Sequence, residues 1–424
     1  MPTIPGTFAC MHPFALLFLA ALLAATAVKV WLSLRHMQHV RAHREQVPPE
    51  FAGEIPAASH RTAADYTVAK GRLDLVEIPI DALLVLLLTF GGGLAWFDAL
   101  LRPVAGDGLV HGVALIGAVV VLTSAVSLPA SIYRTFVIEQ RFGFNKMTPA
   151  MFAGDLLRST LLGCALGLPL LAAVLWLMGA MGEAWWLYVW AVWVGFNLLV
   201  LAVYPTFIAP LFNTFSPLQD SALEARVRTL LERCGFQAQG LFVMDGSKRS
   251  SHGNAYFTGL GRSKRIVFFD TLLARLTPEE IEAVLAHELG HFKLRHVAKR
   301  IAWTFAASLV FLALLAWLAA EPWFYTALGV DRPSTAMALL LFFTVLPSFT
   351  FLLSPLFAWY SRRHEFEADH YAASHAQASD LVRALVKLYK DNASTLTPDP
   401  VHSMFYDSHP PASIRIARLQ SAAR

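Results

Sequence analysis

Apolar stretches of about 20 residues alternate with polar segments along most of the chain. A helix needs about that many apolar residues to cross a bilayer core about 30 Å thick. The pattern therefore predicts seven membrane-spanning helices, near residues 14–32, 82–101, 109–128, 159–181, 184–208, 301–320 and 335–359. The second stretch departs most from the pattern, because Gly91, Gly92 and Gly93 interrupt it.

Two segments, 209–300 and 360–424, are polar enough to fold outside the bilayer. The first contains three short runs typical of strands, separated by Gly- and Ser-rich turns. These runs are residues 240–244, 254–258 and 265–270. A small sheet is the expected result.

Two helices are predicted in or next to these polar segments. Thr277 can cap a helix whose first residue is Pro278, and Glu280 can complete a capping box. We expect this helix to lead almost directly into the sixth spanning helix. Residues 361–390 have helical periodicity and no proline, so they predict one helix that continues out of the membrane.

The first apolar stretch has two interpretations. Ala25-Thr26-Ala27 imitates the small-residue cleavage site of a secretory signal peptide. However, no Lys or Arg precedes the stretch, whereas Lys29 and Arg35 lie at its end. This flank pattern favours a retained membrane anchor with its N-terminus outside.

Basic residues are distributed unevenly between the two sets of loops. Only 15% of the residues are charged, and the formal net charge is +4. With the N-terminus outside, 31 of the 34 Lys and Arg residues fall in cytoplasmic segments, and only Arg102 and Arg332 fall outside. The positive-inside rule accounts for this distribution. The basic excess therefore indicates membrane orientation, and nucleic acid is not a predicted partner.

His287-Glu288-Leu289-Gly290-His291 places two imidazoles one turn apart on the helix predicted from its cap. This spacing lets one helix supply two ligands of a tetrahedral zinc site. Zinc lowers the pKa of a bound water towards about 7. Glu288 is predicted to take the proton of that water and to pass it to the leaving amine of a cleaved amide.

A catalytic zinc takes a third protein ligand and leaves its fourth position to water. The candidates in residues 361–369 are Glu365, Glu367 and His364. On a helix Glu365 and Asp369 share a face, whereas Glu367 points roughly 200° away from Glu365. We therefore predict Glu365 as the ligand and Asp369 as the carboxylate that orients a zinc-bound imidazole. Glu367 is predicted to be solvated or paired with a nearby arginine, and His364 is the less favoured ligand.

With these residues in place, the chain resembles the integral-membrane zinc metalloproteases typified by the type I CAAX prenyl protease. The resemblance rests on an ordered set of motifs: Phe142-Gly143-Phe144-Asn145-Lys146, Asn254-Ala255-Tyr256-Phe257, Arg265 to Thr271, the zinc-site helix, Glu365 to Asp369, and His409-Pro410-Pro411 with Arg415. It implies a barrel of seven helices around a water-filled chamber. It also implies one zinc ion per chain, near the cytoplasmic end of that chamber.

The predicted fold class is thus an all-α polytopic membrane protein of about seven transmembrane helices, with a small α/β zincin-like catalytic portion on the cytoplasmic side. Four parts are expected. They are an N-terminal membrane region of five spanning helices (1–208), a catalytic segment with the HExxH helix (209–300), spanning helices six and seven (301–359) and a C-terminal segment with the third ligand (360–424).

Three further roles follow from the resemblance alone. It implies that Asn254, at the start of an edge strand, helps to hold an extended substrate backbone. It also implies that His409 stabilises the oxyanion and that Arg415 shapes the same corner of the site. Without the resemblance, His409 and Arg415 would be interpreted as surface residues. That interpretation is kept for a group of other histidines: His252, His296, His370, His375 and His402.

The resemblance implies peptide or lipidated protein substrates, cut near their C-terminus and delivered among membrane lipids. The Ala- and Leu-rich composition and the lack of a dibasic C-terminal signal favour a bacterial inner membrane. A heat-shock-type quality-control metalloprotease is the main alternative, although such proteins have fewer spanning helices. A transporter is disfavoured, because a set of zinc ligands and a general base has no role in transport.

Overall fold

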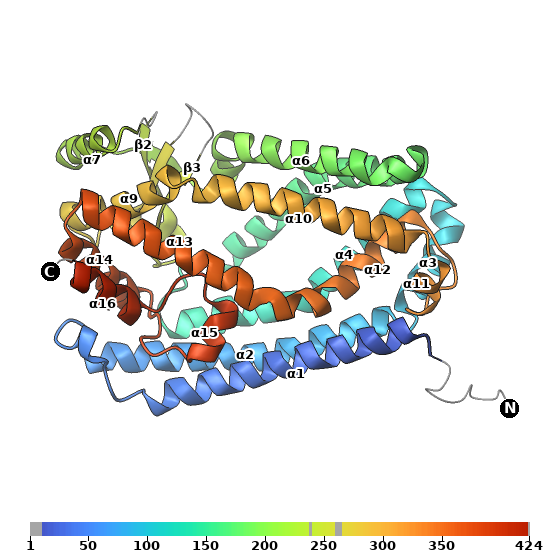
Figure 1. Cartoon of the computed structure of the whole chain (residues 1–424), viewed down its shortest axis with the longest axis horizontal. Coiled ribbons are helices and arrows are strands. Elements are labelled where there is room, and N and C mark those ends of the chain that lie inside the picture. Colours follow the sequence, from blue (N-terminus) through green and yellow to red (C-terminus); the bar gives the residue numbers. More distant parts are fainter. Residues whose placement is uncertain (1–10, 237–239, 259–264, 423–424) are drawn as a thin grey trace.

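The computed structural model describes residues 11–236, 240–258 and 265–422. Long helices run side by side along most of its length, and the sheet lies at one end with α7, α14 and α16 (Figure 1). The described helices are α1 (Pro13–Ala42), α2 (Ala57–Leu88), α3 (Gly93–Ala105), α4 (Leu109–Tyr133), α5 (Pro149–Ala180), α6 (Trp185–Val203), α7 (Ser221–Arg233), α8 (Asp270–Leu273), α9 (Pro278–Lys293), α10 (His296–Ala319), α11 (Pro322–Thr326), α12 (Thr335–Thr350), α13 (Ser354–His375), α14 (Ala378–Asp391), α15 (Pro400–Tyr406) and α16 (Ala412–Ala422).

Six helical segments of the described chain are long and apolar enough to cross a membrane. They are Pro13–Ala42, Leu109–Glu139, Pro149–Ala180, Gly182–Leu211, His296–Ala319 and Thr335–His375. Each coincides with one of the predicted spanning stretches. The last includes both α12 and α13, so a single helical path leads from the membrane to the polar end of the molecule.

The predicted spanning helix at 82–101 is wrong as a single element. α2 ends at Leu88 and α3 begins at Gly93, with a turn between them. A Cβ atom at Gly91 would lie 2.7 Å from the Leu87 carbonyl oxygen, and Gly92 has φ +72°, so this turn requires glycine. α2 itself contains Arg72 and Asp74 and falls outside the six apolar segments, although it runs beside α1 (Figure 1).

The sheet has four strands in the order β1-β2-β4-β3. The predicted strands correspond to β2 (Gly240–Met244), β3 (Ala255–Thr258) and β4 (Arg265–Phe269), whereas β1 (Phe215–Pro217) was not predicted. β2 and β4 are parallel, and the two outer pairs are antiparallel. β3 therefore forms an edge of the sheet.

The Phe142–Lys146 motif fixes the chain that precedes β3. The Lys146 amide donates to the Arg249 carbonyl at 3.1 Å, and the Ser251 amide donates to the Phe144 carbonyl at 3.2 Å. Asn145 and Ser250 form an antiparallel bridge. The loop after α4 thus positions the start of the edge strand.

The helix start predicted at Thr277 is confirmed. The Thr277 hydroxyl accepts from the Glu280 amide, and the Glu280 carboxylate accepts from the Thr277 amide at 2.8 Å. α10 begins three residues after the last residue of α9, as expected. α9 buries Leu285 and Leu289 in one cluster with Ile266 of β4, so the sheet and α9 share a core.

The single helix predicted at 361–390 is wrong in one respect. The helix does continue out of the membrane segment, but α13 ends at His375, where Ala376 is extended with φ −140° and ψ 174°. α14 begins at Ala378 and packs Leu381 and Leu385 into the same core as α9. Burial of this apolar face accounts for the break, because one straight helix would carry that face away from α9.

Candidate metal centre

α9 and α13 pack against each other and bring together side chains from distant parts of the sequence. Gly290 of α9 makes this approach possible, since a Cβ atom there would lie 3.0 Å from the Ala368 Cα of α13. Ala368 is fully buried. The close helix contact places His287 and His291 opposite Glu365.

The three side chains converge on one point. The His287 and His291 Nε2 atoms are 3.3 Å apart, and the Glu365 oxygens lie 3.4 Å from His287 Nε2 and 3.3 Å from His291 Nε2. At metal–ligand bond lengths of about 2.0–2.1 Å, a tetrahedral ion holds its ligand atoms about 3.3–3.4 Å apart. The spacing therefore fits a metal ion bound by these three residues.

Two further observations fit a cation at this point. Glu365 Oε2 is buried and has no hydrogen-bond partner among the described residues. Burial lowers the pKa of His287, but Asp369 and Glu365 outweigh that effect and raise the pKa to about 9. The surroundings thus favour positive charge between these side chains, and the residues present suit a divalent metal.

The structure places Asp369 and Arg415 directly behind His287. Asp369 Oδ1 lies 2.9 Å from His287 Nδ1, so it can accept the ring N–H and leave Nε2 free as a ligand. Arg415 of α16 donates Nε to Asp369 Oδ2 at 2.8 Å and Nη2 to Oδ1 at 2.5 Å. All three residues are buried. Arg415 therefore fixes Asp369 and anchors the C-terminal helix to the site.

Glu367 and His364 lie outside the three-residue cluster. Glu367 accepts from Arg363 Nε at 3.1 Å, the arginine pairing predicted for it. Its other oxygen lies 3.0 Å from His296 Nε2. The interpretation of His296 as a surface histidine is wrong, because this residue is 4% exposed. Nothing in its sequence context signalled that burial.

His409 lies beside the cluster, and Glu288 lies between the two histidines in the sequence of α9. His409 Nε2 is 3.5 Å from Glu365 Oε1, while the side chain is 61% exposed. Glu288 is half-buried on α9, and its charge acts on His409. His409 therefore lies beside Glu365 with much of its side chain open to solvent.

Asn254 is exposed and immediately precedes the edge strand β3. Its carbonyl accepts from the Phe269 amide at 3.0 Å, and its side chain accepts from the Ala255 amide at 2.8 Å. Among the described residues, β3 pairs with β4 alone. The outer side is a row of backbone groups that an extended peptide can join.

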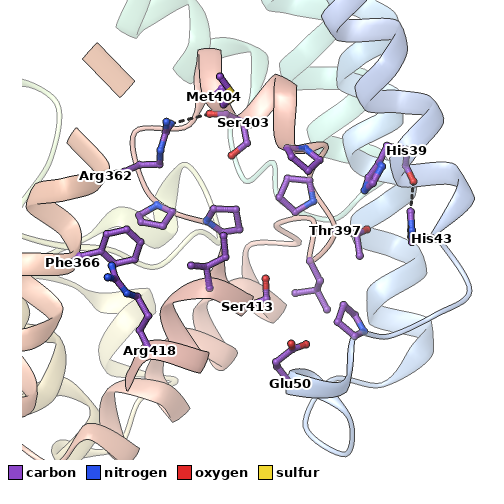
Figure 2. A pocket seen from close by; sticks show the side chains of 17 residues that line it. His39, His43, Glu50, Arg362, Phe366, Thr397, Ser403, Met404, Ser413 and Arg418 are labelled. Atoms are coloured by element: carbon purple, nitrogen blue, oxygen red, sulfur yellow. Dashed lines mark hydrogen bonds between the residues drawn. The ribbon is translucent and has the colours of Figure 1, made fainter. Parts of the chain in front are cut away.

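A pocket of about 750 Å³ lies next to this centre, between α1, α13, α15 and α16 (Figure 2). Arg362 donates to the Ser403 carbonyl at 3.0 Å, and Arg418 covers the Phe366 ring at 4.0 Å. The pocket reaches Pro410 and Pro411, directly after His409. Among the described residues that line it, none belongs to the three-residue cluster.

Comparison with known proteins gives a consistent result over the whole chain. Residues 36–214 match the family described as CAAX prenyl protease N-terminal, five membrane helices, and residues 217–423 match peptidase family M48. A CAAX prenyl protease 1 homolog of Arabidopsis thaliana is 34% identical over 92% of this chain and 94% of its own length. CAAX prenyl protease 1 of Saccharomyces cerevisiae is 31% identical over 91% of each chain.

A solved structure agrees with the sequence matches. The crystal structure of S. mikatae Ste24p superimposes with a TM-score of 0.89 at 29% identity, covering 99% of this chain and 100% of that one. The fold class predicted from the sequence is thus confirmed, and among the described residues six helical segments are long and apolar enough to span a membrane. The chain belongs to the CAAX prenyl protease family, within peptidase family M48, and is a multi-pass membrane metalloprotease.

Proposed function

We propose that the chain is a zinc endopeptidase with one zinc ion held by His287, His291 and Glu365. The observation that carries this proposal is the convergence of these side chains from two helices held together at Gly290: the two imidazole Nε2 atoms are 3.3 Å apart, and each lies 3.3 to 3.4 Å from one of the two Glu365 oxygens. Imidazole and carboxylate ligands at this spacing suit Zn²⁺, which prefers a tetrahedral arrangement with one open position.

Each residue around the open position has its own part in peptide hydrolysis. Bound zinc supplies a Lewis acid that lowers the pKa of water to about 7. Glu288 takes the proton of the attacking water and returns it to the leaving amine. His409 donates Nε2–H to the oxyanion of the tetrahedral intermediate. Asp369, held by Arg415, keeps His287 in the tautomer that binds metal.

The proposed substrate is an extended segment near the C-terminus of a lipidated, CAAX-type protein. The outer side of β3, which Asn254 immediately precedes and which pairs with no other described strand, supports an extended backbone as the bound form. The names of the related proteases support the CAAX class. An attached lipid contributes about 0.8 kcal/mol per buried methylene and delivers the peptide to the membrane.

Glu288→Gln tests the hydrolytic mechanism, and a comparison of substrates with native enzyme tests the substrate class. The purified variant should keep about one zinc per chain while losing hydrolysis, because a base is removed but no ligand is. Native enzyme should cut a farnesylated peptide faster than its plain counterpart, and both faster than unfolded casein. Hydrolysis by the variant would disprove the role of Glu288. Faster cleavage of casein would favour the quality-control class of membrane protease.

We further propose that the catalytic end faces the cytoplasm. With the seven crossings predicted from the sequence, 31 of the 34 basic residues lie in cytoplasmic segments, which supports this orientation. A periplasmic or lumenal reporter fused after residue 330 should be active, and the same reporter at the C-terminus should be inactive; the reverse result would invert the topology. The relatives named above are eukaryotic, so the composition-based assignment to a bacterial inner membrane has no support from them.

A further inference from the structure

The second imidazole of the cluster, His291, also has a partner at its other nitrogen. His291 Nδ1 lies 3.0 Å from His296 Nδ1, and His296 Nε2 lies 3.0 Å from Glu367 Oε2. Arg363 holds the other Glu367 oxygen at 3.1 Å. Two imidazoles, a carboxylate and a guanidinium thus form one continuous chain of contacts that starts at the proposed zinc position between His287, His291 and Glu365.

An unusual backbone turn makes this contact possible. Residues five apart on an uninterrupted helix point about 140° away from each other, so His296 would face away from His291. α9 ends at Lys293, and Arg295 adopts the left-handed conformation with φ +57°. Such a conformation is uncommon for a residue other than glycine. It turns the chain so that the first residue of α10 points back towards α9.

Donors and acceptors along the chain of contacts can be assigned in only one consistent order. The Glu367 carboxylate, held by Arg363, only accepts, so His296 Nε2 carries a hydrogen. In neutral His296 the Nδ1 atom is then an acceptor, and it receives the Nδ1–H of His291. His291 Nε2 is left with its lone pair directed at the proposed zinc position.

We propose that His296 and Glu367 are positioning residues for the metal ligand His291, a role that rests on the proposed zinc site. His296 relays the effect of the carboxylate, since Glu367 is too far along the chain of contacts to reach His291 directly. The relay fixes both the tautomer and the orientation of the His291 ring. Partners of this kind raise metal affinity by about 10- to 100-fold.

The same residues have an alternative use as a second metal site. His296, His364 and Glu367 each offer one ligand atom within 4.8 Å of the others. However, the His296 and His364 rings are stacked 4.0 Å apart with an interplanar angle of 7°. Lone pairs on stacked rings lie side by side and do not converge on one ion. Both His296 nitrogens also have partners already, so the relay is the use that the geometry favours.

The relay is tested by zinc competition with a chromophoric chelator, using full-length protein in detergent. His296→Leu should weaken zinc binding about tenfold. His296→Gln should restore most of the affinity, because its amide offers both an acceptor for His291 and a donor for Glu367. His364→Leu is the matched control: it removes the stacked ring but no member of the relay, and should stay within about twofold of native.

A spectroscopic readout separates positioning from general damage to the fold. In Co²⁺-substituted protein, His296→Leu should shift the visible absorption bands, whereas His364→Leu should leave them unchanged. Glu367→Ala, at a half-exposed position, should weaken binding in the same direction, and so tests the relay even if His296→Leu does not fold. Native affinity and bands in both His296→Leu and Glu367→Ala, or two zinc ions per native chain, would overturn the proposal.

Different results would contradict the proposed zinc site rather than the relay. If native protein bound no zinc, or if His287→Ala and Glu365→Ala kept full zinc affinity, the site itself would be misplaced. If those variants lost zinc while His296→Leu and Glu367→Ala behaved as native, only the relay would be wrong.

Discussion

The two imidazoles of the proposed metal centre are supported by similar chemistry in different surroundings. His287 is held by Asp369 and Arg415, whose side chains are 8% and 6% exposed. His291 is held through His296 by Glu367 and Arg363, whose side chains are 36% and 65% exposed. Each series ends in a carboxylate paired with an arginine. We call Asp369 and Arg415 the buried side and His296, Glu367 and Arg363 the exposed side. The charges of Asp369 and Arg415 cannot be left unpaired without a large cost, whereas water can solvate the charges of Glu367 and Arg363.

The two sides also differ in the elements that they connect. The buried side joins α9, α13 and the C-terminal helix α16, so it ties distant parts of the chain to the metal centre. The exposed side joins α9, α10 and α13, where the catalytic end meets a membrane segment. We infer that the buried side mainly stabilises the fold of the site, while the exposed side adjusts a site already formed.

Asp369→Ala should have the largest effect. It leaves the Arg415 guanidinium buried without its carboxylate, which costs about 3–5 kcal/mol in comparable buried pairs. It also removes the acceptor of His287 Nδ1–H. Thermal unfolding should shift to lower temperature and zinc should be lost on dialysis. Glu367→Ala, the matching change on the exposed side, should keep stoichiometric zinc. Equal effects of the two variants would remove the distinction between the sides.

The metal centre divides into parts that the sequence predicts and parts that it does not. The spacing of His287 and His291, and the shared face of Glu365 and Asp369, follow from helix geometry alone. His296 is different, because its contact requires a left-handed residue at Arg295, a position with no glycine to indicate it. No periodicity rule relates residues across such a turn.

The same reasoning applies to the fold. Apolar length predicts six of the spanning segments, and the three glycines marked the stretch that proved to be two helices. The break at Ala376 had no signal, since neither proline nor glycine lies there. It depends on burial of Leu381 and Leu385 against α9, a contact between segments about 100 residues apart. Tertiary packing overrode a favourable local helix pattern at this point.

Gly290→Ala should have an intermediate effect on stability and zinc affinity, because it changes the spacing of α9 and α13, which carry residues of both the buried and the exposed side. The added methyl would lie 3.0 Å from the Ala368 Cα and 3.1 Å from the Tyr371 Cβ, so α9 and α13 must separate slightly. Overpacking of this kind costs about 1–3 kcal/mol, only partly offset by the better helix propensity of alanine. Zinc affinity should fall together with stability. Gly195→Ala on α6 is the control, because nothing lies within 4 Å of its Cβ position. An unchanged zinc affinity in Gly290→Ala would mean that the helix spacing does not set the ligand geometry.

Arg363→Ala should have the smallest effect and the clearest dependence on salt. Its pair with Glu367 spans one helical turn at an exposed surface, where such pairs contribute about 0–1 kcal/mol. Zinc affinity should change by less than about threefold at physiological salt. The difference from native should shrink further at about 1 M salt, where the Debye length is about 3 Å. By contrast, the fall in zinc affinity that follows loss of the Arg415–Asp369 pair should not depend on salt, because water and ions do not reach this buried pair. Chelator competition at low and high salt measures both dependences. A salt-independent loss of tenfold or more in Arg363→Ala would show that the exposed side is as essential to the metal centre as the buried one.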